Sequence, residues 1–269
     1  MAAGLDGNKA KAARRVIEVL EFFDEQNPRA TVMDIVRRYQ RPQSSTSELL
    51  ASLVELGLLY KDAASRSYTL TPRAAILGSL SQPSMVRDGR LSTLIDRLVA
   101  QTGLGVVLQG MVGLNAQIFR ATCGSRFVPT RLGDLAGGAQ DRLCDSAAGW
   151  LLLSTTKAER RDGVLRRMNA EAAPERKFNV AEMSQRIQER GREGYAIGPA
   201  GYGGTAEMTA VLLPGDPEER PMALGFVYQP CAEIDAAVLA ALLQKSVRSC
   251  LGLSGIDSTG EAAAASSAA

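Results

Sequence analysis

The sequence predicts two domains, a mainly helical N-terminal domain with a β hairpin and a C-terminal α+β domain. The length of 269 residues suits two domains of ordinary size. Helical spacing of apolar residues dominates the first third of the chain, whereas short strands interrupted by helices follow Gly103. A hydrophobic fraction of 45% is sufficient to form hydrophobic cores.

The N-terminal domain begins with three predicted helices. Lys11 to Phe23 carries apolar residues at helical spacing and forms the first. Thr31, followed three residues later by Asp34, indicates the capped start of the second. A turn over residues 40–42, whose proline suits the first position of a helix, leads into the third, which ends at Gly57.

The third predicted helix has the character of a DNA-reading helix. Its first turn is polar, and its later part carries one apolar stripe formed by Leu49, Leu50, Leu53 and Val54. A helix of this kind can lie in the major groove with its first turn against the bases. Residues 58–61 and 67–70 then predict two strands around a turn. Helix, turn, helix and hairpin together indicate a winged helix-turn-helix.

Two stretches, residues 41–50 and 53–59, resemble the DNA-binding domain of IclR-type bacterial transcription regulators, and residues 62–73 are similar to that family's wing and the entry to its linker helix. The resemblance continues more loosely over most of the chain, from about Arg14 to Leu251. Residues 144–149 and 190–196 are similar to segments of that family's GAF-like effector-binding domain. The resemblance implies a winged helix-turn-helix, a linker helix and a C-terminal GAF-like domain.

The expected domain organisation follows from these patterns. It comprises a flexible arm, the winged helix-turn-helix, linker helices, the GAF-like domain and a disordered tail, over residues 1–11, 12–73, 74–102, 103–252 and 253–269. Through residue 78 the chain holds eleven Lys and Arg against nine Asp and Glu, whereas the remainder holds equal numbers. The small positive excess therefore lies in the expected DNA-binding part.

The expected DNA contacts come from the turn, the recognition helix, the wing and the start of the first helix. Gln, Ser and Glu side chains can read base edges, and Arg and Lys side chains can bind phosphates. The candidates are Arg14, Arg15, Arg41, Gln43, Ser44, Ser45, Ser47, Glu48, Lys61 and Arg66.

The resemblance also implies an effector pocket in the C-terminal domain. Where the family has an acid, a cysteine and hydroxyl residues, this sequence has larger or less polar residues, so we expect an apolar or aromatic effector. A hydroxyl of Ser146 or Tyr228 would supply a directional hydrogen bond. The expected lining is Gly110, Met111, Ser146, Ala147, Gly198, Met208, Leu224, Phe226 and Tyr228. Trp150 is expected to be a packing residue instead.

Composition excludes several kinds of chemistry. The chain contains no histidine, so no Ser-His-Asp, Cys-His or His-ligated metal site can form. Its four cysteines lack C-x-x-C spacing. We therefore expect no catalytic residue, no metal and no cofactor, and a protein that is not an enzyme. The absence of a long apolar stretch and of a signal-peptide pattern predicts a cytoplasmic protein without a membrane partner.

These observations together predict a ligand-responsive regulator of a catabolic operon. One short recognition helix reads few base pairs, so a palindromic double-stranded DNA operator bound by a homodimer or homotetramer is expected. Two alternatives are a winged-helix module that binds proteins without DNA, and a small-molecule enzyme built on the C-terminal domain.

Overall fold

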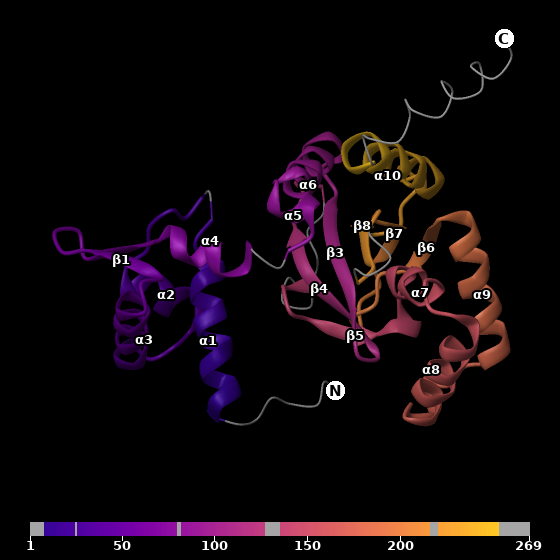
Figure 1. Cartoon of the computed structure of the whole chain (residues 1–269), viewed down its shortest axis with the longest axis horizontal. Helices are drawn as coiled ribbons and strands as arrows, with labels where there is room; N and C mark the ends of the chain where they lie inside the picture. The colour runs from indigo at the N-terminus through magenta and orange to yellow at the C-terminus, as the bar shows by residue number, and fades with distance from the viewer. Residues whose placement is uncertain (1–7, 25, 80–81, 127–134, 216–219, 253–269) are drawn as a thin grey trace, which may run out of the picture. The chain divides into compact units, whose positions relative to one another are not determined.

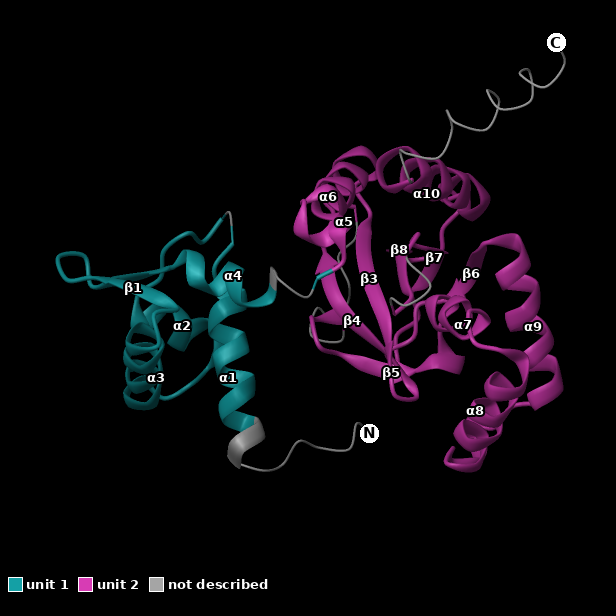
Figure 2. Cartoon of the chain, viewed as in Figure 1, with its two compact units in different colours: residues 1–82 teal, residues 83–269 magenta. Residues whose placement is uncertain are grey.

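The computed structural model describes residues 8–24, 26–79, 82–126, 135–215 and 220–252, and the chain divides into two compact units, residues 1–82 and 83–269 (Figure 2). The predicted tail over residues 253–269, and most of the predicted arm, lie outside the described residues. Each unit buries its own apolar residues, in one core in the first unit and in two in the second.

The first unit is a winged helix-turn-helix. Three helices precede a two-stranded antiparallel hairpin, and a further helix follows it (Figure 1); they are α1 (Asn8–Phe22), α2 (Val32–Tyr39), α3 (Gln43–Glu55), β1 (Leu59–Asp62), β2 (Ser67–Leu70) and α4 (Pro72–Ser79). Backbone hydrogen bonds between Ala30 and Tyr68 attach the start of α2 to the hairpin. The core beneath is formed by Val19, Ile35, Leu50 and Leu53 with their neighbours.

Local sequence signals explain the helix boundaries of this unit. Thr31 and Asp34 form the predicted capping box, in which each side chain accepts a hydrogen bond from the other residue's backbone N–H. Gln40 ends α2 in the left-handed region, with φ of 51°. Pro42 is the N-cap of α3 and precedes its first residue, so the prediction of proline at the first helical position is wrong by one residue.

The second unit is a six-stranded antiparallel sheet with helices on both faces (Figure 1). The strand order is β5-β4-β3-β8-β7-β6, and the strands are β3 (Gly105–Val112), β4 (Asn115–Thr122), β5 (Gln140–Arg142), β6 (Tyr195–Pro199), β7 (Glu207–Leu212) and β8 (Met222–Tyr228). The helices are α5 (Ser84–Arg87), α6 (Arg90–Thr102), α7 (Ala147–Ser154), α8 (Ala158–Ala170), α9 (Val180–Glu193) and α10 (Ala236–Leu251), with short 3-10 turns at Leu143–Asp145 and Pro174–Arg176. The expected α+β architecture is therefore confirmed.

Two cores lie on opposite faces of this sheet. One contains α7 with the side chains of Val107, Ile118, Met208 and Val227. The other contains α6 and α10 with those of Val106, Leu108, Phe226 and other residues of the sheet. We refer to the first as the α7 face and to the second as the α6/α10 face.

The position of α6 changes the predicted boundary between the linker helices and the second domain. This helix was expected as part of the linker, but its residues Leu91, Leu94, Ile95 and Leu98 are buried in the core of the α6/α10 face. The helix thus belongs to the second unit, because its apolar stripe packs against the sheet. Strand β5 and helix α5 were not predicted, since three or four residues are too few to show a period. No helix of the described segments is both long and apolar enough to cross a bilayer.

Candidate functional site

The first turns of α3 present an exposed polar surface. Gln43, Ser44, Ser47 and Glu48 are exposed. Thr46 lies between these residues in the sequence but is buried, and its hydroxyl donates to the carbonyl of Pro42 at 2.8 Å. Leu50 and Leu53 fix the opposite side of the helix in the core. Four of the predicted base-reading side chains therefore share one accessible surface on a helix that is anchored from behind.

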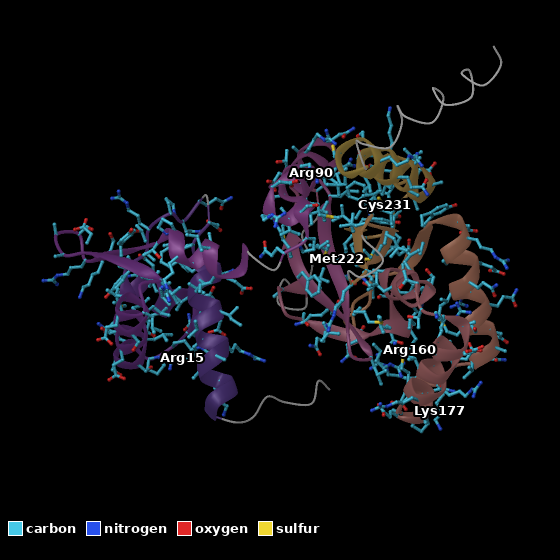
Figure 3. All side chains as sticks on the ribbon, in the orientation of Figure 1. Arg15, Arg90, Arg160, Lys177, Met222 and Cys231 are labelled. Carbon is cyan, nitrogen blue, oxygen red and sulfur yellow. The ribbon has the colours of Figure 1, made fainter. Side chains whose placement is uncertain are left out.

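Three other predicted DNA contacts are occupied within the protein. Arg15, labelled on α1 in Figure 3, donates through Nη2 to Ser45 Oγ at 3.1 Å. Arg41 Nη2 lies 2.8 Å from Glu18 Oε1 and 3.2 Å from Oε2. These contacts join α1 to the turn and first residues of α3. Arg15, Arg41 and Ser45 thus position the recognition helix, a role that the sequence analysis did not assign to them.

The wing carries two exposed cations, Lys61 and Arg66. Lys61 Nζ lies 5.9 Å from the ring centroid of Tyr68, a cation–π geometry. Asp62 closes the turn by accepting from the Ser65 hydroxyl at 2.7 Å and from the Ala64 N–H at 2.9 Å. Those bonds, that of Ser65 first, lower the pKa of Asp62. The Asp62 carboxylate therefore orders the tip of the hairpin, while the exposed Lys61 and Arg66 can contact a phosphate.

Three arginines of the first unit were not among the predicted DNA contacts. Arg29, Arg37 and Arg38 line an open hollow of about 600 Å³ together with Phe22, Asn27 and Asp34. The adjacent basic residues Arg37 and Arg38 at the end of α2 could have been noticed in the sequence. Arg29 is brought next to them only by the fold. This hollow adds positive charge beside α2.

In the second unit, the structure separates the predicted effector-binding residues onto two faces of the sheet. Leu224, Phe226 and Tyr228 belong to the α6/α10 face. The Tyr228 hydroxyl is bonded to Thr209 Oγ1 at 2.8 Å, so it is not available on the α7 face. The prediction that these three side chains line one effector pocket together with Met208 is therefore wrong. A shift of one residue along β8 moves every side chain to the other face.

The β8 residues on the α7 face are Ala223, Gly225 and Val227. Ala223 and Val227 belong to its core, and a Cβ on Gly225 would lie 3.0 Å from Met208 Cγ. Ala147 and Met208 are buried in the same core, and Met111 packs against it from a partly exposed position. Ser146 is the N-cap of α7 and accepts from Gly149 N at 3.1 Å. Of the residues predicted to line the effector pocket, the α7 face therefore contains Met111, Ser146, Ala147 and Met208.

Two predicted glycines meet aromatic rings. A Cβ on Gly198 would lie 2.7 Å from Trp150 Cζ3, so the indole covers that strand. Trp150 donates through Nε1 to the carbonyl of Cys144 at 2.7 Å and is 6% exposed, as expected for a packing residue. A Cβ on Gly110 would lie 2.3 Å from the Phe119 ring. At each of these two positions, the absence of a side chain leaves room for an aromatic ring of the protein itself.

A cluster of ion pairs closes one end of the α7 face. Arg142 donates through Nη2 and Nε to the two oxygens of Asp145, at 2.9 and 3.0 Å, and Arg176 also pairs with Asp145. Burial alone would raise the pKa of Asp145, but the bonds from Arg142 and Cys144 and the charges of Arg142 and Arg176 lower it overall. Asp141 accepts from the backbone N–H of Tyr202 at 2.6 Å. The cluster therefore ties the start of α7 to the turn after β6.

The thiol beside this cluster is unsuited to redox chemistry. Burial and the neighbouring Asp145 carboxylate raise the pKa of Cys144 to about 12. A thiol at that pKa carries almost no thiolate at neutral pH. In the described residues the four cysteines are free, and Cys123 and Cys231 are exposed.

Comparison with known proteins bears on the first unit most directly. Residues 12–63 match the model of the IclR helix-turn-helix domain. This chain carries an IclR-type helix-turn-helix. The match spans most of α1, all of α2 and α3 and the start of the wing, and so includes the exposed surface of α3. A search of curated proteins gave no match to the sequence.

Solved structures extend the likeness beyond the IclR-type helix-turn-helix to the whole fold. An IclR homologue from Microbacterium hydrocarbonoxydans, complexed with 4-hydroxybenzoate, is 20% identical, with a TM-score of 0.55 over 88% of this chain and 95% of that one. IclR from Thermotoga maritima is 14% identical, with a TM-score of 0.54 over 89% and 95%. The effector domain of the putative regulator IclR from Acinetobacter sp. ADP1 is 20% identical, with a TM-score of 0.52 over 61% and 95%. The chain has the two-domain fold of the Microbacterium and Thermotoga proteins, and the Acinetobacter effector domain matches 61% of it.

Proposed function

We propose that this protein is a ligand-responsive transcription regulator that binds double-stranded DNA through α3 and its wing. The observation that carries the proposal is the exposed polar surface of Gln43, Ser44, Ser47 and Glu48 in a domain that matches the IclR helix-turn-helix. Gln can bind adenine bidentately, and Glu can accept from cytosine N4. The exposed Arg14 and the wing cations supply phosphate contacts.

The proposal includes a palindromic operator bound by a homodimer or homotetramer, because one helix reads too few base pairs for specificity in a genome. A small-molecule effector, such as a catabolite of the regulated operon, binds in the second unit on the α7 face. Support for an effector comes from the relative that was crystallised with 4-hydroxybenzoate, a small aromatic acid. The protein has two states that differ in their affinity for DNA, and the effector binds one of them more tightly than the other. This difference in effector affinity shifts the equilibrium between the states and so regulates DNA binding.

The DNA-binding proposal is tested by selecting duplexes from a random pool and measuring their binding by fluorescence anisotropy. Glu48→Ala is expected to change the selected base at one position, by about 1–3 kcal/mol of discrimination. Glu55→Ala is the matched control, because Glu55 is exposed on the last turn of the same helix. An unchanged motif with Glu48→Ala would show that α3 does not read bases through this side chain.

A second measurement separates specific binding from charge alone. Lys61→Ala is expected to weaken all duplexes alike and to reduce the slope of log K against log salt by about 0.9 for each phosphate that is no longer neutralised. The absence of duplex binding by the wild-type protein at low salt would overturn the regulator proposal.

A further inference from the structure

The side chain of Gln109 is buried in the second unit and has no hydrogen-bond partner among the described residues. Gln109 on β3 is 0% exposed, and neither Nε2 nor Oε1 bonds to any residue in the described part of the chain. Buried carboxamides normally form hydrogen bonds, because an unpaired one costs free energy. Packing alone therefore does not account for a glutamine here.

The strand register shows which way Gln109 faces. It lies opposite Ile118 on β4 and Ala223 on β8, and both belong to the core of the α7 face. Val107 and Met111, two residues away on the same strand, pack in that core as well. None of these four side chains offers a strong donor or acceptor. The carboxamide therefore faces the α7 side of the sheet, and these four strand neighbours are apolar.

Alanines occupy two positions beside Gln109 and Met111 on the neighbouring strands. Ala223 lies directly opposite Gln109, and Ala116 lies opposite Met111 on the neighbouring strand. The start of α7 adds Ala147 and Ala148 to the same core. Met111 is only partly buried, and an unbranched methionine adapts easily to a neighbour. A ligand beside Gln109 would thus meet Ala223, the adaptable Met111 and an amide that has no partner among the described residues.

We propose that the Gln109 carboxamide is the polar anchor of the effector, and that the effector presents a neutral group which both donates and accepts. This inference rests on the proposed function. The amide edge has one acceptor, Oε1, and one donor, Nε2, so only such a group pairs with both. A carboxamide or lactam edge does so with adjacent atoms, and a hydroxyl does so through one oxygen.

A carboxylate fits this anchor poorly. It can accept from Nε2 but cannot donate to Oε1, and it would bring a charge into apolar surroundings. The structure thus refines the expectation of an apolar or aromatic effector. The ligand class is a largely apolar ring that bears an amide-like or hydroxyl group.

The test compares two probes of the same shape by isothermal titration calorimetry on the full chain. Benzamide can donate and accept, whereas acetophenone can only accept. Benzamide is expected to bind the wild-type protein about tenfold more tightly than acetophenone, and Gln109→Met is expected to bring the two affinities within about twofold. Gln101→Met is the matched control, because Gln101 is exposed on α6, and it should retain the tenfold difference.

A second readout follows the amide itself. The side-chain NH₂ resonance that is missing from the NMR spectrum of Gln109→Met should shift in the wild-type protein when benzamide is added. Equal binding of both probes, no binding of benzamide, an unmoved resonance, or a difference that persists in Gln109→Met would each overturn the inference. DNA binding by the wild-type protein, measured without either probe, separates the two proposals. Failure to bind DNA would contradict the proposed function as a regulator but would not contradict the role of Gln109 in ligand binding.

Discussion

Replacing Gln109 by methionine should stabilise the ligand-free protein, the reverse of what most core substitutions do. Methionine has nearly the volume of glutamine, so the core keeps its packing, while the two unpaired polar atoms disappear. Each buried unsatisfied polar group costs about 1–3 kcal/mol. Because both atoms belong to one amide and the new side chain can adjust, we expect a net gain of about 2 kcal/mol in the free energy of unfolding.

The gain can be measured by calorimetry of the ligand-free protein. For a domain of about 150–250 residues, 1 kcal/mol corresponds to roughly 2–4 °C in Tm, so the transition of the second unit should rise by about 4–8 °C. The transition of the first unit serves as an internal control and should not move, since Gln109 belongs to the second unit. Gln109→Glu should have the opposite effect, because an unpaired charge in that position is costlier than an amide.

A Tm that Gln109→Met lowers or leaves unchanged would contradict this prediction. Such a result would mean that the amide is satisfied in solution, and it would remove the physical reason for regarding Gln109 as a ligand anchor.

Two further predictions concern titratable groups at the end of the α7 face. The Cys144 thiol, whose pKa burial raises to about 12, should remain unlabelled by iodoacetamide at pH 8 in the native protein, while the exposed Cys123 and Cys231 react. Peptide mass spectrometry decides this, and rapid labelling of Cys144 would show that the thiol is accessible. The pKa of Asp145 is lowered from about 3.8, so its contribution to stability is fully present above that pH and is lost as the pH falls through the lowered pKa. Asp145→Asn should therefore be less stable than the wild-type protein at pH 7, and the difference should shrink as the pH falls through the lowered pKa. A deficit that stays the same on acidification would mean that the charge of Asp145 is not the cause.

Local chemistry determined most of the secondary structure. The capping box of Thr31 and Asp34 depends on residues three apart, and it was readable without the fold. The apolar stripe of α3, the hairpin of the wing and the helical spacing in α6 were equally visible, because each reflects a period within one element. The polar first turns of α3 remained exposed, as their pattern predicted.

The sequence could not determine which face each residue of β8 takes. That strand is buried on both faces, so its residues are apolar without alternation and two registers fit equally well. Pairing with β3 and β7 decided it, and turned Phe226 and Tyr228 away from the α7 face. Tertiary structure likewise paired Arg41 with Glu18 across 23 positions of sequence and left the Gln109 amide without a partner among the described residues. Such facts depend on neighbours that are distant in the chain, and only the packed structure brings them together.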